Sequence, residues 1–74
     1  MNNKTTKDKI YKLGRNIFKR RKHLKFSQNM LAEKLDISRE HLAKIETAKR
    51  TVSLDLLIKI AYELDTKVKD LIDF

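Results

Sequence analysis

The segment FSQNMLAEKLDISREHLAKIE, residues 26–46, contains two short helical patterns with almost no chain between them. Apolar residues recur at helical spacing on both sides of the junction: Leu31 and Leu35 precede it and Leu42 follows it. Neither glycine nor proline separates the two patterns, since the chain has one glycine, Gly14, and no proline. A connection of about three residues leaves no slack, so the second helix must cross the first at a steep angle.

Two residues near the junction favour this close crossing. Ala32 is small and lets the helices approach each other, and Ile37 fills the corner between them. This order of residue types is typical of a helix-turn-helix, here at about residues 28–47, in which the second helix is exposed on one side and can enter a DNA major groove. A plain corner between two helices in an unrelated protein would be the alternative.

The rest of the chain predicts further helices and no strands, because helical spacing appears throughout and period-2 alternation does not. Ser27, Ser38 and Ser53 are the expected N-caps. We expect a compact all-α fold of five orthogonally packed helices, residues 7–74, after a flexible arm at 1–6. The expected helices are 7–24, 28–35, 39–47, 54–64 and 67–72. In the fourth helix the expected inward residues are Leu54, Leu57, Ile58, Ala61 and Leu64.

Composition excludes several classes of protein. The chain has 74 residues, enough for one domain, and no cysteine, which removes disulfides and thiolate metal sites and favours a reducing cytoplasm. No apolar run reaches the ~20 residues of a membrane span. The net charge of +8 is concentrated at the start: residues 1–30 hold ten Lys or Arg and one Asp. Residues 51–74 hold three basic and five acidic residues. Such asymmetry points to a polyanionic partner on one side, although a basic helix kept for solubility would look the same.

At this point the sequence resembles the Xre family, the phage-repressor and Cro type of helix-turn-helix. The resemblance runs from about residue 13 to 71 and implies a five-helix fold and a DNA-binding regulator, usually dimeric. The residues that carry it are Gly14, Ile17, Arg21, Ser27–Ala32, Asp36–Ser38, Leu42, Lys44–Glu46, Lys49, Arg50, Ser53, Leu54, Ile60, Ala61, Leu64 and Leu71.

The chain departs from the family pattern mainly in its turns. The family often has glycine, which suits left-handed turns, at the positions of Lys25, Asp36, Ala48 and Asp65. It often has proline at the position of Val52 and an apolar residue at that of Arg20. These departures affect the expected loop geometry more than the fold.

The helix that begins at Arg39 is the expected recognition helix, and its expected base-reading residues are Arg39, Glu40, His41, Ala43 and Lys44. Arg39 stands at the end that enters the groove deepest, where its guanidinium suits guanine O6 and N7. Glu40 can accept a hydrogen bond from cytosine N4, or instead only pair internally with Arg39 or Lys44. Lys44, one turn further on, can reach a base or a phosphate.

A second group of residues is expected to contact the DNA backbone. Gln28 opens the second helix, where a helix N-terminus favours anions, and in the family this position usually meets a phosphate. Lys49 and Arg50 follow the recognition helix, and Lys22 and Lys25 flank the first turn. We give the cluster more weight than any single lysine, because an isolated surface lysine is usually only solvated.

The resemblance gives Arg21 and Glu46 a structural role. In the family these two positions pair and tie the first helix to the end of the third. A buried, paired arginine holds the recognition helix at its angle, so we do not expect Arg21 to contact DNA.

Other features suggest a dimer and no catalytic site. Leu56, Ile60, Ile72 and Phe74 are the expected exposed apolar patch, and such patches often mark an interface; scattered surface apolar residues are the alternative. His23 and His41 stand on different elements without a third ligand, so we expect no metal. No nucleophile motif or phosphate loop is present, and we expect no enzyme, cofactor or small-molecule ligand.

The sequence is thus interpreted as a cytoplasmic, sequence-specific double-stranded DNA-binding regulator from a bacterium or phage, expected to act as a repressor and a homodimer. A phage repressor, a restriction–modification controller and an antitoxin all fit. The alternatives are a protein–protein adaptor or a nonspecific nucleic-acid binder that reuses the fold. Membrane attachment through the basic first helix ranks lower, because the apolar stripe of that helix is needed for the core.

Overall fold

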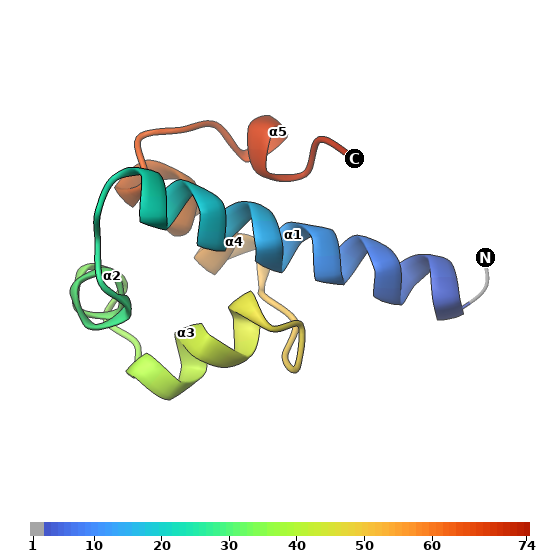
Figure 1. The fold of residues 1–74 in the computed structure, drawn as a ribbon, viewed down its shortest axis with the longest axis horizontal. Helices are drawn as coiled ribbons and strands as arrows, with labels where there is room; N and C mark the ends of the chain where they lie inside the picture. The colour runs from blue at the N-terminus through green and yellow to red at the C-terminus, as the bar shows by residue number, and fades with distance from the viewer. Residues whose placement is uncertain (1–2) are drawn as a thin grey trace.

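A computed structural model describes residues 3–74 and contains five α-helices, without strands in that part of the chain. They are α1 (Asn3–His23), α2 (Gln28–Leu35), α3 (Arg39–Glu46), α4 (Leu54–Glu63) and α5 (Val68–Leu71). The expected all-α architecture is confirmed (Figure 1). The expected bounds agree within one residue except at the start of α1, which begins at Asn3 and not at Lys7. Residues 1 and 2 of the expected arm lie outside the described residues.

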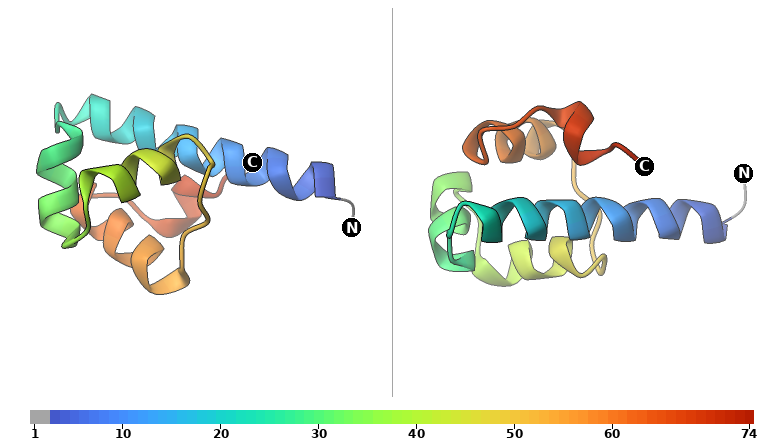
Figure 2. Two further views of the ribbon diagram at one scale, coloured as in Figure 1. Left: turned by 90° about the horizontal axis from the view of Figure 1, so that it is seen from below. Right: turned by 45° about the horizontal axis from the view of Figure 1, so that its top comes forward.

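Helix α1 occupies the middle of the fold, with α3 along one side and α5 along the other (Figure 1). Helix α2 crosses the end of α3 at a steep angle (Figure 2, left), as the short connection between them requires. The N-terminal end of α1 extends past the rest of the molecule in every view (Figures 1 and 2). The side chains on this end are accordingly exposed from Thr5 to Lys9.

The core lies where these helices meet. Its buried apolar residues come from all five helices, and they are Ile17, Leu31, Ala32, Leu35, Leu42, Ile45, Leu57, Ile60, Ala61, Leu64 and Leu71. The predicted inward residues of α2 and α3 are all buried, and Ile37 packs against the core from the turn between them. The helix-turn-helix is therefore held by apolar contacts on its inner side, which leaves the outer side of α3 free.

The expected inner face of α4 was wrong in part. Leu54 and Ile58 are 67% and 52% exposed, while Ile60 is fully buried. Leu57, Ala61 and Leu64 are buried as expected. The helix is thus rotated so that Ile60 faces the core, and a stripe of Leu54, Ile58 and Tyr62 faces outward at i, i+4, i+8 spacing.

Three helix N-termini have the serine caps that the sequence predicted. The hydroxyl oxygens of Ser27, Ser38 and Ser53 each accept a hydrogen bond from the amide three residues on, at 3.0, 3.0 and 3.2 Å. These three bonds satisfy amides at helix N-termini that have no acceptor within the helix.

The turns adopt the left-handed conformation at the four positions where the family often has glycine. The backbone φ angles are 62° at Lys25, 58° at Asp36, 62° at Ala48 and 53° at Asp65. The turn geometry is therefore kept without glycine, at a cost of about 1–2 kcal/mol for each such residue. Arg20 acts at the last of these turns, because its Nε donates to Leu64 O at 2.8 Å and its Nη2 to Asp65 O at 2.9 Å. A polar Arg20 in place of an apolar residue thus caps the end of α4.

Gly14 is required where α1 passes the end of α3. A Cβ placed there would lie 2.6 Å from Ile45 O and 2.8 Å from Glu46 O, both backbone atoms. Because backbone cannot move aside as a flexible side chain does, a larger residue would push the two helices apart.

We therefore expect Gly14→Ala to lower the free energy of unfolding by about 1–3 kcal/mol, in spite of the higher helix propensity of alanine. Lys12→Ala, at an exposed position of the same helix, should change it by less than about 0.5 kcal/mol. Urea unfolding followed by circular dichroism measures both. A Gly14→Ala variant as stable as the unchanged chain would show that the two helices are not in tight contact.

Candidate nucleic-acid interface

The outward surface of α3 carries the five residues expected to read bases. Arg39, Glu40 and Lys44 are exposed, and His41 and Ala43 are half-buried at the two margins of the helix. Leu42, Ile45 and Glu46 face inward and are buried. The helix thus presents a polar, mainly basic surface along its length and is anchored by its opposite side.

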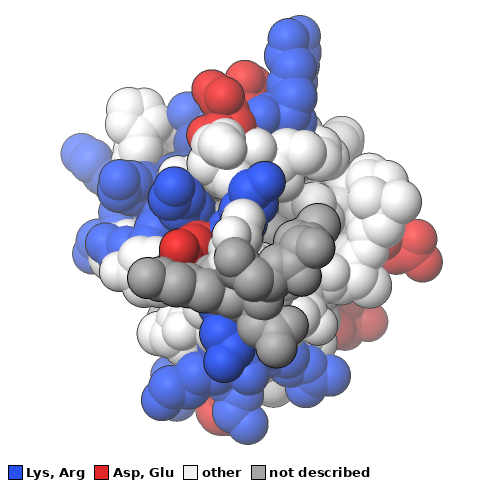
Figure 3. Space-filling model, turned by 90° about the vertical axis from the view of Figure 1, so that its right-hand side faces the viewer, with Lys and Arg blue, Asp and Glu red and all other residues white. Residues whose placement is uncertain are grey.

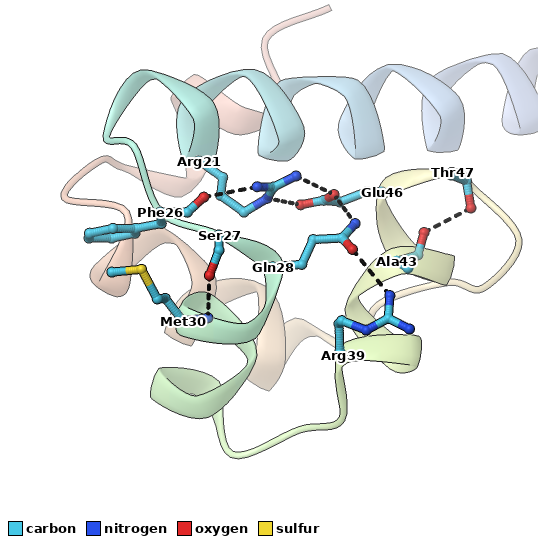
Figure 4. Close-up of polar contacts among 9 residues, drawn as sticks. All are labelled: Arg21, Phe26, Ser27, Gln28, Met30, Arg39, Ala43, Glu46 and Thr47. Atoms are coloured by element: carbon cyan, nitrogen blue, oxygen red, sulfur yellow. Dashed lines mark hydrogen bonds and ion pairs between the residues drawn. The ribbon is translucent and has the colours of Figure 1, made fainter.

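One buried ion pair connects α1 to the end of α3, as the resemblance implied (Figure 4). Arg21 Nε lies 2.7 Å from Glu46 Oε2, and Arg21 Nη2 donates to Glu46 Oε1 at 3.1 Å. Arg21 Nη1 donates to Phe26 O at 2.9 Å, which ties the turn after α1 to the same pair. The side chains are only 6% and 2% exposed. The fork geometry with two parallel bonds is the strong form of this interaction.

Gln28 extends the ion pair toward the outer surface (Figure 4). Its Nε2 donates to Glu46 Oε1 at 2.9 Å, and its Oε1 accepts from Arg39 Nη1 at 3.5 Å. The sequence predicted that the side chain and the backbone N–H of Gln28 meet a phosphate. In the structure the side-chain amide lies between Glu46 and Arg39, and the backbone N–H lies at the N-terminus of α2, where amides have no acceptor within the helix.

Arg39 is the outermost member of this chain of contacts. Its guanidinium is also 3.4 Å from Glu40 Oε1, an exposed pair. Exposed pairs of this kind contribute at most about 1 kcal/mol, and weak contacts at 3.4–3.5 Å are readily exchanged. Arg39 is therefore oriented by Gln28 and Glu40 while its donors stay available on the surface.

His41 lies in the first turn of α3 beside two cations. Partial burial, followed by the positive charges of Arg50 and Lys44, lowers the pKa of His41 below its usual value. The imidazole is therefore neutral at pH 7, with one nitrogen to donate and one to accept. The same result shows that Arg50 and Lys44 raise the positive potential over this part of α3.

The expected backbone-contacting cations are all exposed: Lys22 in the last turn of α1, Lys25 after that helix, and Lys49 and Arg50 after α3. Among residues 5–74, whose side chains the structure describes, the ion pairs join Arg21 to Glu46 and Arg39 to Glu40. The four cations thus have no acidic partner within the described chain. Lys and Arg side chains gather below the N-terminal end of α1, on the side where Figure 1 places α3 (Figure 3).

The structure also places near the interface one cation that was not predicted from the sequence. Lys7, far away in sequence, lines the same hollow as Lys49 and Arg50. No spacing in the sequence indicates this neighbourhood, because it depends on the long first helix passing the turn after α3.

The expected apolar patch is changed by the burial of Ile60. Ile72 and Phe74 are exposed, Leu56 is half-buried, and fully buried Ile60 belongs to the core. The exposed apolar residues on α4 are instead those of the outward stripe, Leu54, Ile58 and Tyr62.

The described residues contain no group of three or more His, Cys, Asp or Glu side chains that could hold a metal ion. Within the same residues no helix is long and apolar enough to cross a membrane.

A model of the helix-turn-helix family matches residues 17–71 of the chain. Among curated proteins, the control protein C.BamHI of Bacillus amyloliquefaciens is 44% identical over 48 residues, which are 65% of this chain and 59% of the relative. The matched part thus spans about three fifths of the relative's length.

Solved structures give the same picture. The restriction-modification controller protein C.AhdI from Aeromonas hydrophila superposes with a TM-score of 0.80 at 29% identity, over 84% of this chain and 94% of that one. The clp gene regulator ClgR from Corynebacterium glutamicum gives 0.83 at 25% identity, over 85% and 67%. These relatives are control proteins and a gene regulator and not enzymes, in agreement with the expectation from the sequence.

Loss of Glu46 should destabilise the fold. Glu46→Ala leaves the Arg21 charge buried without its partner, and we expect the free energy of unfolding to fall by about 3–5 kcal/mol. Glu40→Ala removes an exposed pair of the same helix and should cost less than about 1 kcal/mol. Thermal and urea unfolding compare the two variants; equal small losses would mean that the buried pair contributes no more than the exposed one.

Proposed function

The chain belongs to the helix-turn-helix family of the Xre, Cro/C1 type, which consists of DNA-binding regulators, and on this premise we propose that it recognises a specific double-stranded DNA sequence through α3. The single observation that supports this proposal best is the outward face of α3, where Arg39 is exposed in the first turn and is contacted from behind by Gln28, which the buried pair holds. A guanidinium held at the first turn of such a helix suits bidentate contact with guanine in the major groove.

We assign the remaining contacts by their place around α3. Glu40, His41, Ala43 and Lys44 line the surface that would face the bases, since they lie on the helix's exposed side and margins. The cations Lys22, Lys25, Lys49 and Arg50 flank it and would contact phosphates, as would the backbone N–H at Gln28. Arg21 and Glu46 are buried and would contribute only by holding α3 in place.

We further propose that the protein binds as a homodimer to an inverted repeat. Leu54, Ile58 and Tyr62 form an apolar stripe on α4 whose members are 67%, 52% and 81% exposed. Ile72 and Phe74, near the C-terminal end, are also exposed. A second copy would remove this apolar surface from water. Two-fold symmetry would then require half-sites about 34 Å apart, or a similar helical repeat.

The physiological role is proposed from the relatives. One relative is a control protein, another is a restriction-modification controller, and a third is a regulator of the clp gene. We place this chain among transcription regulators of the same kind, acting in the bacterial cytoplasm, where the chromosome lies. A protein bound over a promoter can block access of the transcription machinery, and on this ground we propose repression.

Selection from a random duplex library at physiological salt tests the function, followed by sequencing of the bound DNA. An enriched inverted repeat is the expected result. Pools that stay random, while binding persists only at low salt, would favour a nonspecific binder. Absence of DNA binding at any salt would favour the protein–protein adaptor.

Arg39 should carry base preference in that assay. With the enriched duplex, Arg39→Ala is expected to lose about 1–3 kcal/mol of discrimination against a base change at one position of each half-site, about 5- to 150-fold. Arg39→Lys keeps the charge but lacks the fork, so it should lose much of the same discrimination. Titration of matched and mismatched duplexes measures this. Full discrimination by Arg39→Ala would assign base reading to other residues.

The outward stripe on α4 should determine the oligomeric state. Ile58→Lys places a charge in the stripe and should give a monomer by sedimentation at concentrations where the unchanged chain is dimeric. Asp55→Asn adds the same unit of charge at an exposed position of α4 and should remain dimeric. A monomeric unchanged chain at high micromolar concentration would overturn the dimer.

A further inference from the structure

A hollow of about 240 Å³ lies between α1 and the turn that follows α3. It is lined by Lys7 and Ile10 from α1, and by Ala48, Lys49, Arg50 and Thr51 from the turn. Lys7, Lys49, Arg50 and Thr51 are exposed, so the hollow opens at the surface. Two segments, one long before the helix-turn-helix in the sequence and one directly after it, thus build one concave site.

The composition of this hollow is suited to an anion. Three cations line it, and no acidic residue of the described chain is among its lining residues. None of the three cations belongs to the ion pairs found in residues 3–74. Like charges gathered without a counterion repel one another, and a bound anion relieves this repulsion.

The apolar and hydroxyl-bearing residues of the hollow favour one kind of anion. Ile10 and Ala48 supply apolar contacts beside the cations, and Thr51 supplies a hydroxyl. A phosphodiester flanked by deoxyribose presents charged oxygens together with apolar carbon atoms, which matches this mixture better than a bare inorganic ion does.

A second observation places the hollow in the electrostatic field of α3. Arg50, one of its cations, together with Lys44, contributes to the lowered pKa of His41 in the first turn of that helix. Arg50 therefore belongs both to the hollow and to the positive charge around the first turn of α3.

We propose that this hollow binds a DNA backbone phosphate beyond the segment read by α3, with Lys7 as a phosphate contact contributed by α1. The proposal rests on the proposed function. The exposed, protruding end of α1 is then part of the surface that contacts DNA. The DNA footprint extends past the recognition helix on the side of the turn at residues 48–51.

A pair of charge-matched variants tests the assignment. Lys7→Gln and Lys9→Gln each remove one charge from an exposed position of α1, but only Lys7 lines the hollow. With the duplex enriched by selection, the slope of log K against log salt should decrease for Lys7→Gln by about 0.9 for each bound copy of the chain, or about 1.8 for the proposed dimer. It should not change for Lys9→Gln, and base preference should be unchanged in both. Melting temperatures confirm that both variants fold.

Shortening the duplex from its outer ends gives the second readout. The unchanged chain should lose affinity when the flanking phosphates are removed, and Lys7→Gln should lose less on the same shortening, because one of the three cations of the hollow is already absent. Equal slopes for the two lysine variants, or an equal loss on shortening, would overturn the phosphate site. If selection enriches no sequence, the proposed function fails, and the same slopes measured on a random duplex still decide whether Lys7 contacts a phosphate.

Discussion

The buried contact between Arg21 and Glu46 is the interaction on which the arrangement of α3 depends. These two are the buried charged residues of the described chain, and charges placed in a protein interior are tolerated only when they are paired and hydrogen-bonded. Gly14, Ile17 and Arg21 are spaced at i, i+3 and i+7, so they lie on one face of α1. That face thus supplies the close approach to the end of α3, an apolar anchor and the charged partner.

The carboxylate of Glu46 also connects the core to the outer surface of α3. Glu46 accepts hydrogen bonds from Arg21 and from Gln28, and Gln28 accepts one from Arg39. Contacts that begin in the core therefore end at the side chain proposed to read a base. The Gln28 contact at 3.5 Å is weak, so it biases the position of Arg39 and does not fix it. Such a bias lowers the conformational freedom that is lost on binding.

The sequence predicted the helices, their serine caps and the pair because these depend on local spacing or on the resemblance. It left the geometry of four turns open, because the glycine that the family often has there is missing, and the structure keeps the left-handed conformation at all four. The face of α4 was predicted wrongly because that helix is apolar almost all round, and helical spacing fits two orientations. Packing against the other helices selects the one that buries Ile60. The partner of the Gln28 side chain and the position of Lys7 depend on distant residues, so no local pattern indicates them.

We propose that the buried pair positions α3 for DNA recognition, in addition to its contribution to the stability of the fold. The most direct measurement is the ratio of specific to nonspecific DNA affinity for the double variant Arg21→Met, Glu46→Leu. Apolar replacement of both partners is often neutral or stabilising, so the fold should be kept. Without the carboxylate to hold Gln28, we predict that affinity for the selected duplex falls at least about tenfold, or about 1.4 kcal/mol, while affinity for unrelated DNA is unchanged. An unchanged ratio in a folded double variant would contradict the claim.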